Sequence, residues 1–503
     1  MKLSRVIALV LCLATAAAFA GCEKAQTGQP TAAPNVTSEP PAEQPGAQEN
    51  AYTADVVVVG GGLAGLSAAI KARQSGAEVI LIEKLGMLGG SSALSGGGLG
   101  ATNSSVQREN GIEDSNESWK QLWVERQATS PRESRYPDWD RVDWLIENSA
   151  ASIDWYLSLG YKFRTPEGFG VDPVLRLHFP YPEGGGSVLT GFLENKANEL
   201  GVTILKETPA TELMVKDGAV AGVKAGSKSG EVTLNAKAVV LACGGFARSR
   251  ELIGRFTPEV LEYFDYSVSG VGNTGDGIRM AEAVGAVTYE DNWMIGLGLR
   301  SPVQQMNNFY WYGTFAFVNN DGERFTNEGG HYAIVYNDAV FSAPGGAWML
   351  FDSGEAFKPF VEAAEGAAES EHVLKADTLE ELAAAIGADA AKLSATIASY
   401  NQVAAGGTDP FGKPAMQCVP LTAGPFYAVR FYPCNMGTFG GVKTTDSFEV
   451  IDASGSPIPG LYAAGEMCNR PFYNMVYMSG SALQLAALTG QTAGEAAAAY
   501  AKK

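Results

Sequence analysis

A short stretch near the N-terminus, Ala54–Ile70, constrains the fold more than any other part of the chain. Its β-branched run predicts a buried parallel strand, a glycine turn follows, and an Ala-rich segment predicts a helix. Gly60 allows a sharp turn, Gly62 lets the backbone approach a bound group closely, and Gly65 lets the helix pack on the strand. The spacing predicts a nucleotide-binding βαβ unit with a pyrophosphate at the positive end of the helix.

A second predicted strand, Glu78–Ile82, continues this pattern and ends in Glu83, whose carboxylate can accept hydrogen bonds from a ribose. Residues 84–101 then form a long loop rich in glycine and serine. Such a loop can place backbone N–H groups and hydroxyls along a pyrophosphate and a flavin edge, and NAD-binding folds rarely need one. The loop therefore favours FAD over NAD as the dinucleotide.

Further glycine turns lie far along the chain. Residues 238–246 read as another buried strand that ends in a glycine pair, and Thr274–Gly277 precedes a predicted helix. Near the C-terminus, residues 459–466 read Pro-Gly-Leu-Tyr-Ala-Ala-Gly-Glu, and Gly480–Leu483 opens a last predicted helix. Between these motifs, residues 106–200 read as mainly helical and residues 201–245 as alternating strands.

This ordered series resembles the FAD-binding family that includes soluble fumarate reductases, urocanate reductases, succinate dehydrogenase flavoprotein subunits and 3-ketosteroid 1-dehydrogenases. The resemblance covers roughly residues 52–500. It implies an α/β fold in which a Rossmann-like FAD-binding domain, residues 52–290 and 432–503, carries an inserted α+β capping domain, residues 291–431. The active site would lie where the cap meets the isoalloxazine ring.

The glycine turns and the acids that follow them predict the FAD contacts. The family's usual attachment histidine is not visible near Leu94, so non-covalent FAD is predicted. The predicted contact residues are Gly60, Gly62, Leu63, Ala64, Gly65, Glu83, Lys84, Gly89, Gly90, Ser91, Ser92, Gly97, Gly98, Ala242, Gly244, Gly245, Thr274, Gly275, Asp276, Gly465, Glu466, Ser481, Ala482 and Leu483.

Composition excludes several classes of function. A chain of 503 residues with 46% apolar and 18% charged residues is long enough for two domains with large cores. Its net charge of −19 argues against nucleic-acid partners, which need a basic surface. The six cysteines show neither haem-attachment nor cluster spacing, and with three histidines a metal site is not expected. A disulfide between Cys418 and Cys434 stays open.

The N-terminal residues predict export. Residues 1–21 combine a positive end with an apolar run too short to span a bilayer comfortably, as in a signal peptide. Phe19–Cys22 resembles a bacterial lipobox, which predicts lipidation of Cys22 and tethering to the outer face of the cytoplasmic membrane. Cleavage after Ala20 by ordinary signal peptidase, giving a secreted or periplasmic protein, is the alternative. Residues 22–51 read as a disordered linker.

One segment of the predicted cap resembles the catalytic region of the family. Residues 318–328 match the fumarate reductase motif that leads, four residues later, to a catalytic arginine, but this chain has Tyr332 there. Ketosteroid dehydrogenases resemble it more closely, because their catalytic tyrosine follows at the same spacing. The other cationic positions of a dicarboxylate clamp fall near Gly437 and Tyr477, and the Glu/Arg proton path falls near Asn308 and Trp311. Fumarate therefore does not suit this site, since two carboxylates need cations.

A tyrosine-rich site suits a substrate with a carbonyl next to a C=C bond. Flavin N5 would deliver hydride to the β-carbon, Tyr332 would protonate the α-carbon, and Tyr477 with the Gly480 N–H would stabilise the enolate. One alternative is that His331 is the acid. Another is that Tyr332 is a core residue whose hydroxyl is satisfied by a hydrogen bond and has no catalytic role. Further tyrosines, at positions 310, 312 and 473, are possible members of the site, and residues 309–312 line the cavity or form a cap strand.

The leading hypothesis is an exported flavin-dependent reductase of an enone, a steroid-like ring or an arylacrylate. It needs an external electron-donor protein, either a cytochrome, a flavoprotein or a quinol-linked protein, as in anaerobic respiration. The alternatives are a ketosteroid-type dehydrogenase, a fumarate or urocanate reductase with a rebuilt site, and a non-catalytic flavin carrier. A carrier has no need of a substrate lid, so the predicted cap argues against the last.

Overall fold

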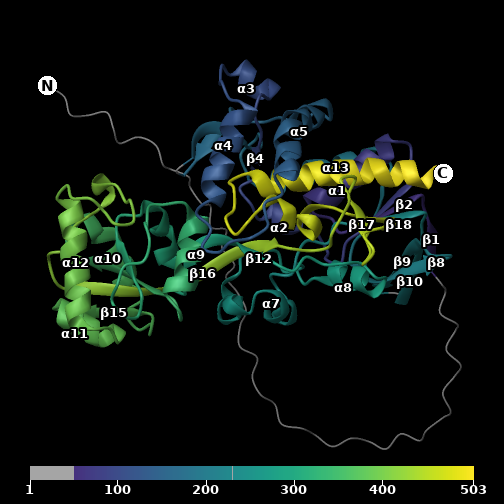
Figure 1. Cartoon of the computed structure of the whole chain (residues 1–503). Coiled ribbons are helices and arrows are strands. Elements are labelled where there is room, and N and C mark those ends of the chain that lie inside the picture. Colours follow the sequence, from purple (N-terminus) through teal and green to yellow (C-terminus); the bar gives the residue numbers. More distant parts are fainter. Residues whose placement is uncertain (1–49, 171, 229) are drawn as a thin grey trace, which may run out of the picture. The chain divides into compact units, whose positions relative to one another are not determined.

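The computed structural model describes residues 50–170, 172–228 and 230–503 (Figure 1). A six-stranded sheet has the order β17-β18-β11-β2-β3-β7, and its strands are parallel except for the pair β17–β18. The strands are β2 (Val56–Val59), β3 (Val79–Ile82), β7 (Thr203–Leu205), β11 (Ala238–Leu241), β17 (Glu449–Ile451) and β18 (Pro457–Ala463).

The carboxyl ends of the central strands coincide at one edge of this sheet. Val59 pairs with both Ile82 and Leu241, and Leu241 pairs with Ala463. The loops that follow β2, β3, β11 and β18 therefore leave the sheet side by side. In open α/β sheets this edge is where ligands bind.

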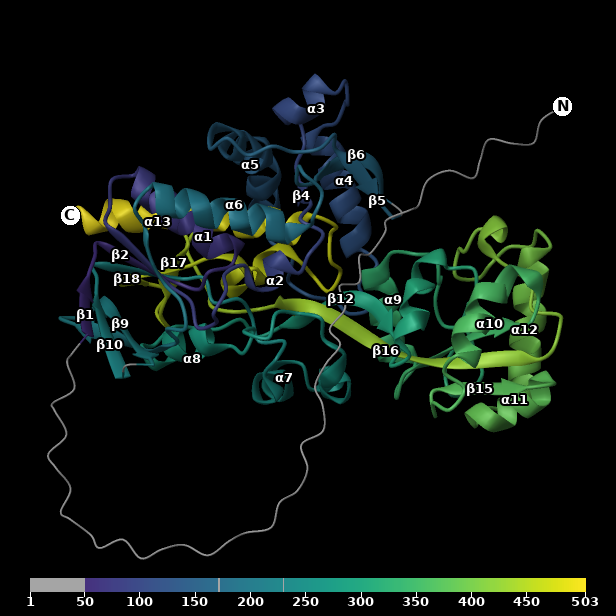
Figure 2. The same ribbon diagram turned by 180° about the vertical axis from the view of Figure 1, so that it is seen from behind.

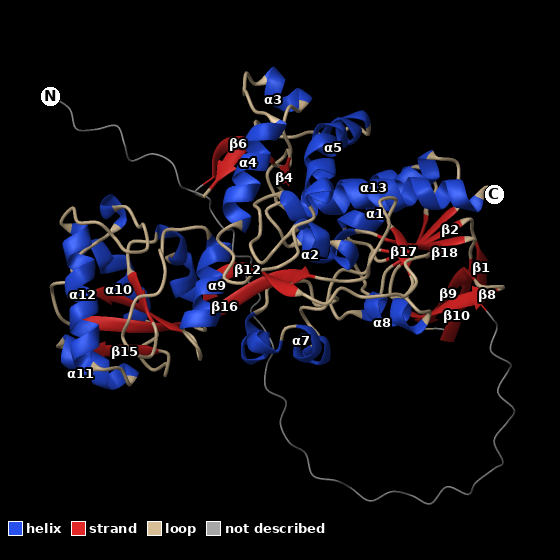
Figure 3. Cartoon of the chain, viewed as in Figure 1, coloured by secondary structure: helices blue, strands red, loops and turns tan. Residues whose placement is uncertain are grey.

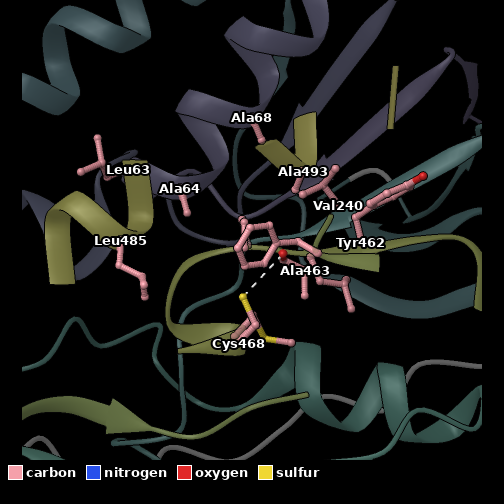
Figure 4. Packing of buried hydrophobic residues seen from close by; sticks show 14 of the residues in the cluster. Leu63, Ala64, Ala68, Val240, Tyr462, Ala463, Cys468, Leu485 and Ala493 are labelled. Atoms are coloured by element: carbon pink, nitrogen blue, oxygen red, sulfur yellow. Dashed lines mark hydrogen bonds between the residues drawn. The ribbon is translucent and has the colours of Figure 1, made fainter. Parts of the chain in front are cut away.

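Two helices with small residues at their contact cover one face of the sheet. In α13 (Ser481–Ala501), a Cβ added to Gly490 or Gly494 would lie 2.3 Å from the carbonyl oxygen of Ala64 or Ala68 in α1 (Leu63–Gln74). Figure 4 shows Ala64, Ala68 and Ala493 in the core between these helices and the strands. The glycines let the two helices approach backbone to backbone. On the outer side, α6 (Gly186–Glu199) contacts α1 (Figure 2).

The other face of the sheet carries a second, four-stranded sheet of order β1-β10-β9-β8, whose strand β9 contacts β11 and β18. These strands and the strands of the six-stranded sheet confirm the expected alternation of strands in residues 201–245. The bounds are β1 (Asn50–Thr53), β8 (Ala210–Lys216), β9 (Ala219–Ser227) and β10 (Gly230–Asn235).

The expectation that residues 106–200 are mainly helical is confirmed. The segment also contains two strands that the sequence interpretation overlooked, and they belong to a three-stranded sheet of order β4-β6-β5. The bounds are α2 (Gly90–Ala93), β4 (Leu99–Gly100), α3 (Ser105–Glu109), α4 (Asn116–Gln127), α5 (Trp139–Ser158), β5 (Glu167–Phe169) and β6 (Asp172–His178).

The inserted part of the chain has a hydrophobic core of its own, made of buried residues between Leu299 and Phe431. Its helices α10 and α11 pack on β16, α11 also packs on β15, and α12 packs on α11 (Figure 3). The bounds are β12 (Trp293–Arg300), β13 (Ala316–Val318), α9 (Tyr332–Ser342), β14 (Ala347–Asp352), α10 (Lys358–Glu365), β15 (Val373–Ala376), α11 (Leu379–Ile386), α12 (Ala390–Ala404) and β16 (Phe426–Phe439).

The strand β16 joins the two cores. Its first half pairs with β14 and β15, and its second half pairs with β12, so one strand of 14 residues runs from the inserted core to the first core. The first core contains Trp293, Met294 and Phe439 from this paired region. The second core thus lies within the predicted cap limits of 291–431, while β16 continues past the predicted boundary.

Several expectations about single segments have a definite outcome. Residues 309–312 do not form a cap strand, because Tyr310–Tyr312 is a short 3₁₀ turn that follows another at Gln304–Asn308. Cys418 and Cys434 are free thiols, so the possible disulfide is not formed. The predicted signal peptide, Cys22 and the start of the linker lie outside the described residues. Within the described part of the chain, no helix is both long and apolar enough to cross a membrane.

The remaining short elements connect these layers. They are α7 (Arg250–Phe256), α8 (Asp276–Ala283) and the 3₁₀ helices Pro258–Tyr266, Glu355–Phe357, Ala415–Gln417, Gly465–Cys468 and Arg470–Phe472. The expected helices after Thr274–Gly277 and at Gly480–Leu483 are confirmed as α8 and α13.

Candidate active site

A cavity of about 420 Å³ opens at the carboxyl edge of the central sheet. Segments far apart in the chain line it: the β2–α1 turn, the end of β3, residues 90–98, residues 268–276, and the start of α13. One end is walled mainly by glycine backbone and is called the cradle below. The other end is walled by Phe169, Tyr332, Tyr477 and Ser479 and is called the substrate end.

The first glycine turn of the cradle cannot hold side chains. Gly60 has φ +106°, and a Cβ there would lie 2.4 Å from the carbonyl oxygen of Ala242. A Cβ on Gly65 would lie 1.8 Å from the oxygen of Gly60. Gly62 caps the N-terminus of α1 and lines the cavity. The N–H groups of the first helical turn therefore lie at the wall, where an anionic pyrophosphate is stabilised.

Glu83 lies at the end of β3 with both carboxylate oxygens fixed by backbone. Its Oε2 accepts a hydrogen bond from the Gly61 N–H at 2.8 Å, and its Oε1 accepts one from the Leu85 N–H at 2.9 Å. A carboxylate oxygen can accept more than one hydrogen bond, so Glu83 retains acceptor capacity toward the cavity that it lines. This is the position expected for an acid that binds a ribose.

Two further loops are tied to the first turn by side chains. The Ser92 hydroxyl accepts a hydrogen bond from the Leu63 N–H at 3.3 Å, and the Ser91 hydroxyl accepts one from the Gly270 N–H at 2.9 Å. The Lys84 ammonium donates to Thr274 at 2.6 Å and pairs with Asp276 at the start of α8. These bonds hold the loops after β2, β3 and β11 in one wall.

Glu466 is an acid of the cradle whose carboxylate is held by several hydrogen bonds. Its carboxylate accepts hydrogen bonds from the N–H and hydroxyl of Thr438, at 2.6 and 2.8 Å, and from the Asn273 amide. Burial raises the pKa of this carboxyl above its usual value, and the bonds from Thr438 and Asn273 oppose that rise. Gly245 leaves room for this network, since a Cβ there would lie 2.0 Å from the Thr438 hydroxyl.

Most of the predicted FAD contacts line the cavity. Those that do are Gly60, Gly62, Leu63, Ala64, Glu83, Lys84, Gly90, Ser91, Ser92, Gly97, Gly98, Ala242, Gly244, Asp276, Gly465, Glu466, Ala482 and Leu483. The others, Gly65, Gly89, Gly245, Thr274, Gly275 and Ser481, lie behind the wall and shape it through turns, packing and hydrogen bonds.

The residues present fit FAD. Glycine backbone, a helix N-terminus and an acid at the end of β3 match its pyrophosphate and ribose. The rest of the cavity is apolar where an aromatic ring system would lie, with Ile295, Leu297 and Met436 among its lining residues. None of the chain's three histidines lines the cavity.

Four aromatic rings meet at the substrate end. Tyr332 is the first residue of α9, and its ring lies 6.2 Å from that of Tyr477, 6.0 Å from that of Phe169 and 6.0 Å from that of Trp311. Phe169 comes from β5 and Trp311 from the inserted part, and both are exposed. Phe169, Tyr332 and Tyr477 line the cavity, and Trp311 packs against Phe169 and Tyr332 outside that lining.

The two tyrosine hydroxyls of the substrate end differ in their partners. Burial raises the pKa of Tyr332 well above 10, and its hydroxyl lies 3.1 Å from that of Ser479. Burial raises the pKa of Tyr477 to about 12, while hydrogen bonds from the backbone N–H groups of Ala482 and Gly480 lower it. The Tyr477 oxygen thus lies at the positive end of α13, next to the Gly480 N–H.

His331 is close to Tyr332 but does not line the cavity. Its ring stacks on that of Tyr332, and burial together with Arg126 lowers its pKa to about 4. A neutral imidazole is a poor proton donor, so this position does not suit the alternative in which His331 is the acid. The Tyr310, Tyr312 and Tyr473 side chains also lie away from the cavity lining.

Charge separates the two ends of the cavity. Its charged lining residues are Glu83, Lys84, Asp276 and Glu466, all in the cradle, and no arginine or histidine is found among the described lining residues. Lys84 is neutralised by Asp276. The substrate end therefore lacks the cations that would pair with two carboxylates.

Sequence reasoning missed several lining residues, above all Ser479, Asn273, Phe169 and Phe179. Ser479 lies between Tyr477 and Gly480, two residues that the motif did identify. Its place in the sequence could therefore have indicated that it belongs to the site. Phe169 lies on a strand within a segment taken as helical, and no local pattern placed it near Tyr332. Across the described residues, no group of side chains could hold a metal ion.

Comparison with known proteins agrees with this geometry. The family model for the FAD binding domain matches residues 55–483. The chain is 31% identical to the cytochrome-type fumarate reductase of Shewanella frigidimarina, over 90% of this chain and 78% of the relative. It is also 31% identical to the vinyl phenol reductase of Lactiplantibacillus plantarum, over 82% of this chain and 89% of that protein.

A solved structure shows the same similarity in three dimensions. The 3-ketosteroid-Δ4-(5α)-dehydrogenase of Rhodococcus jostii, in complex with 4-androstene-3,17-dione, superposes with a TM-score of 0.71. Sequence identity is 26%, and the match covers 89% of this chain and 97% of the dehydrogenase. The similarity extends through both the cradle and the inserted part.

Proposed function

The chain belongs to the family of proteins with this FAD binding domain, and from that premise we propose that it reduces a C=C bond conjugated to a carbonyl. Its place among fumarate, vinyl phenol and ketosteroid enzymes makes it an FAD-dependent oxidoreductase that acts on carbon–carbon bonds. Bound FAD, when reduced, supplies the hydride for such a reaction. The protein must then bind the substrate, polarise it and supply a proton.

The observation that carries the proposal is the neutral, aromatic substrate end. Phe169 and Tyr332 line it, Trp311 packs against both of these rings, and no arginine or histidine lines it among the described residues. A dicarboxylate would lose its hydration there without gaining cationic partners, whereas an aryl or steroid-like ring gains contact area. The substrate is therefore an enone, a steroid-like ring or an arylacrylate with at most one charge.

Two tyrosines have different roles in the proposed reaction: Tyr477 binds the substrate carbonyl and Tyr332 donates the proton. Tyr477 and the Gly480 N–H bind the substrate carbonyl at the N-terminus of α13, where the helix dipole stabilises charge that develops on the oxygen. Tyr332 then protonates the α-carbon as general acid. Because burial keeps Tyr332 protonated well above pH 10, reduction is the favoured direction. The ketosteroid-type dehydrogenation would need the ionised form and is the second candidate.

The proposal also includes the source of the electrons and the location of the protein. Each turnover consumes two electrons, which we propose arrive from a separate cytochrome, flavoprotein or quinol-linked protein. The lipobox-like residues before Cys22 support tethering of the mature chain to the outer face of the cytoplasmic membrane, with the predicted linker as a spacer up to β1, which begins at Asn50. Release as a secreted or periplasmic protein is the alternative.

The test uses the FAD-loaded protein with reduced methyl viologen as donor under argon. Oxidation of the viologen is followed with fumarate, urocanate, cinnamates and ketosteroids. We expect turnover on an enone or arylacrylate, a loss of about 10²- to 10⁴-fold in Tyr332→Phe, and an unchanged rate in Tyr500→Phe at the far end of α13. Turnover of fumarate that survives Tyr332→Phe would overturn both the substrate class and the acid.

The pH dependence gives an independent check on the direction. Tyr332 must be protonated for reduction and ionised for dehydrogenation, and burial raises its pKa well above 10. The reductive rate should therefore be flat from about pH 6 to 9, while the oxidative rate should rise about tenfold per pH unit. A reductive rate that falls steadily above pH 7 would contradict Tyr332 as the acid.

A further inference from the structure

A buried loop carries Tyr477 into the site without helical or strand structure of its own. This loop, called the strap below, comprises residues 473–478 between the 3₁₀ helix Arg470–Phe472 and α13. All of its residues are buried. Backbone N–H and C=O groups that are buried outside helices and strands lack regular hydrogen-bond partners, and each unpaired group lowers stability. The strap therefore depends on partners from other parts of the chain.

Side chains supply partners for the consecutive carbonyl groups of residues 472–476. In chain order, the donor and acceptor pairs are Trp123 Nε1 with Phe472, Arg470 Nη1 with Tyr473 and Asn474, Asn337 Nδ2 with Met475, and Gln127 Nε2 with Val476. The donors come from α4, from α9 and from the 3₁₀ helix before the strap. Elements that are far apart in the chain therefore fix the path of the strap.

Gln127, the last residue of α4, holds the strap with both ends of its amide. Its Oε1 accepts a hydrogen bond from the Asn474 N–H at 2.7 Å, and its Nε2 donates to the Val476 carbonyl oxygen at 2.7 Å. An amide side chain can donate and accept at the same time, so it pairs with a peptide backbone as another backbone would. Because Val476 directly precedes Tyr477, these two bonds fix the backbone from which the Tyr477 ring leaves.

Asn337 connects the strap to the helix that carries Tyr332. Its Nδ2 donates to the Met475 carbonyl oxygen at 2.9 Å, and its Oδ1 accepts a hydrogen bond from Trp293 Nε1 at 2.9 Å. Tyr332 is the first residue of α9, and Asn337 follows it in the same helix. Asn337 is 1% exposed, so both of its bonds are shielded from water. The bond to the strap therefore relates the position of Tyr477 to that of Tyr332, whose ring lies 6.2 Å away.

We propose that Gln127 and Asn337 are positioning residues, which act through the strap to place Tyr477 relative to Tyr332. Neither side chain is among the residues that line the cavity, so neither contacts the substrate. Their bonds hold the Tyr477 hydroxyl at the N-terminus of α13, where the substrate carbonyl binds. Without these bonds the hydroxyl moves away from that position, and the enolate loses a preorganised hydrogen-bond donor. The inference rests on the proposed role of Tyr477.

A direct test of the placement needs no turnover. In FAD-loaded protein, 3-fluorotyrosine incorporated at position 477 reports the surroundings of that ring by ¹⁹F NMR. Two variants, Gln127→Met and Asn337→Leu, remove the bonds to the strap from α4 and from α9, and they are called the strap variants below. We expect each to shift and broaden the ¹⁹F signal. Because the two changes lie on separate helices, the result does not depend on a single variant being able to fold.

Gln107 in α3 offers a matched control. It is also a buried glutamine, and its Oε1 accepts from the Ser104 N–H at 3.1 Å while its Nε2 donates to the Leu175 carbonyl oxygen at 3.0 Å. Its bonds thus have the same form as those of Gln127 but do not reach the strap. Gln107→Met should lower the melting temperature as the strap variants do and leave the ¹⁹F signal unchanged.

The kinetic test is a double-mutant cycle in FAD-loaded protein with reduced methyl viologen as donor. The substrate is the cinnamate or ketosteroid that turns over fastest. Tyr477→Phe should lower kcat by about 10²- to 10³-fold, as the loss of an oxyanion donor does. Each strap variant should lower kcat by about tenfold and raise KM less, because Tyr477 binds the developing enolate more strongly than the carbonyl. In the Tyr477→Phe background each strap variant should change kcat by less than about twofold.

The outcomes separate this inference from the function beneath it. If Tyr477→Phe retains full activity, the proposed carbonyl-binding role fails, and the ¹⁹F signal still shows whether the strap places the ring. If the strap variants lower kcat by the same factor with and without the Tyr477 hydroxyl, they act through general stability, and the inference is overturned. A ¹⁹F signal that stays unchanged in both strap variants overturns it for every substrate.

Discussion

The two ends of the cavity are built from different materials. The cradle is made of backbone: glycines at its turns, helix N–H groups, and acids held by neighbouring N–H groups. The substrate end is made of side chains, with Phe169, Tyr332, Tyr477 and Ser479 arriving from separate segments. Backbone groups can bind the cofactor whichever substrate the protein uses, whereas side chains can select a particular substrate. The comparison therefore separates the part of the cavity that suits FAD from the part that would determine substrate specificity.

The sharpest way to break this comparison is to add one carbon atom to the cradle. A Cβ in Gly65→Ala would lie 1.8 Å from the Gly60 oxygen, so the turn and α1 must separate. We expect at least a tenfold loss of bound FAD, measured as the ratio of flavin to protein after purification, and a lowered melting temperature.

The matched control is another helical glycine. A Cβ at Gly191 in α6 would meet nothing within 4 Å, and its φ is not positive. Gly191→Ala should therefore retain FAD and stabilise the protein by about 1 kcal/mol, as measured by urea unfolding. Retention of FAD by both variants would show that the backbone contact at Gly65 is not required.

A second prediction concerns two buried histidines, His178 and His331. Burial lowers the pKa of His178 and of His331 to about 4, against 6.5 in an unfolded chain. Between pH 6.5 and 4 the unfolded chain therefore binds more protons than the folded protein. Their stabilising contribution is complete above pH 6.5 and falls as the pH drops through this window, by up to a few kcal/mol for each histidine.

Urea unfolding of the FAD-loaded protein at pH 7 and at pH 5 measures this loss. His331→Asn keeps a side chain that can cap α9 and should show a smaller difference between the two pH values. An unchanged difference in His331→Asn would mean that His331 is already charged in the folded protein.

The comparison also explains how far sequence alone could go. Gly60, Gly62, Gly65 and Glu83 lie within one βαβ unit, so their spacing predicts their arrangement with no knowledge of the rest of the fold. Tyr332 came from a family motif rather than from local geometry. The neighbours of Tyr332 could not be predicted, because Phe169 reaches it from β5 and Trp311 from a 3₁₀ turn more than a hundred residues later. Such contacts depend on how the cap packs against the first core.

The last prediction sharpens the comparison at the substrate end. Phe169 and Trp311 each hold an edge-to-face contact with Tyr332, and aromatic contacts of this kind contribute about 0.5–1.5 kcal/mol. Phe169→Ala or Trp311→Ala should therefore raise KM for an aryl or steroid-like substrate by about two- to tenfold and leave FAD binding intact. A small alkyl enone should show less change, since it cannot span both rings. Trp139→Ala, an exposed tryptophan at the start of α5, is the matched control and should alter neither value. Equal effects on large and small substrates would mean that the rings support the local fold around Tyr332 rather than select the substrate.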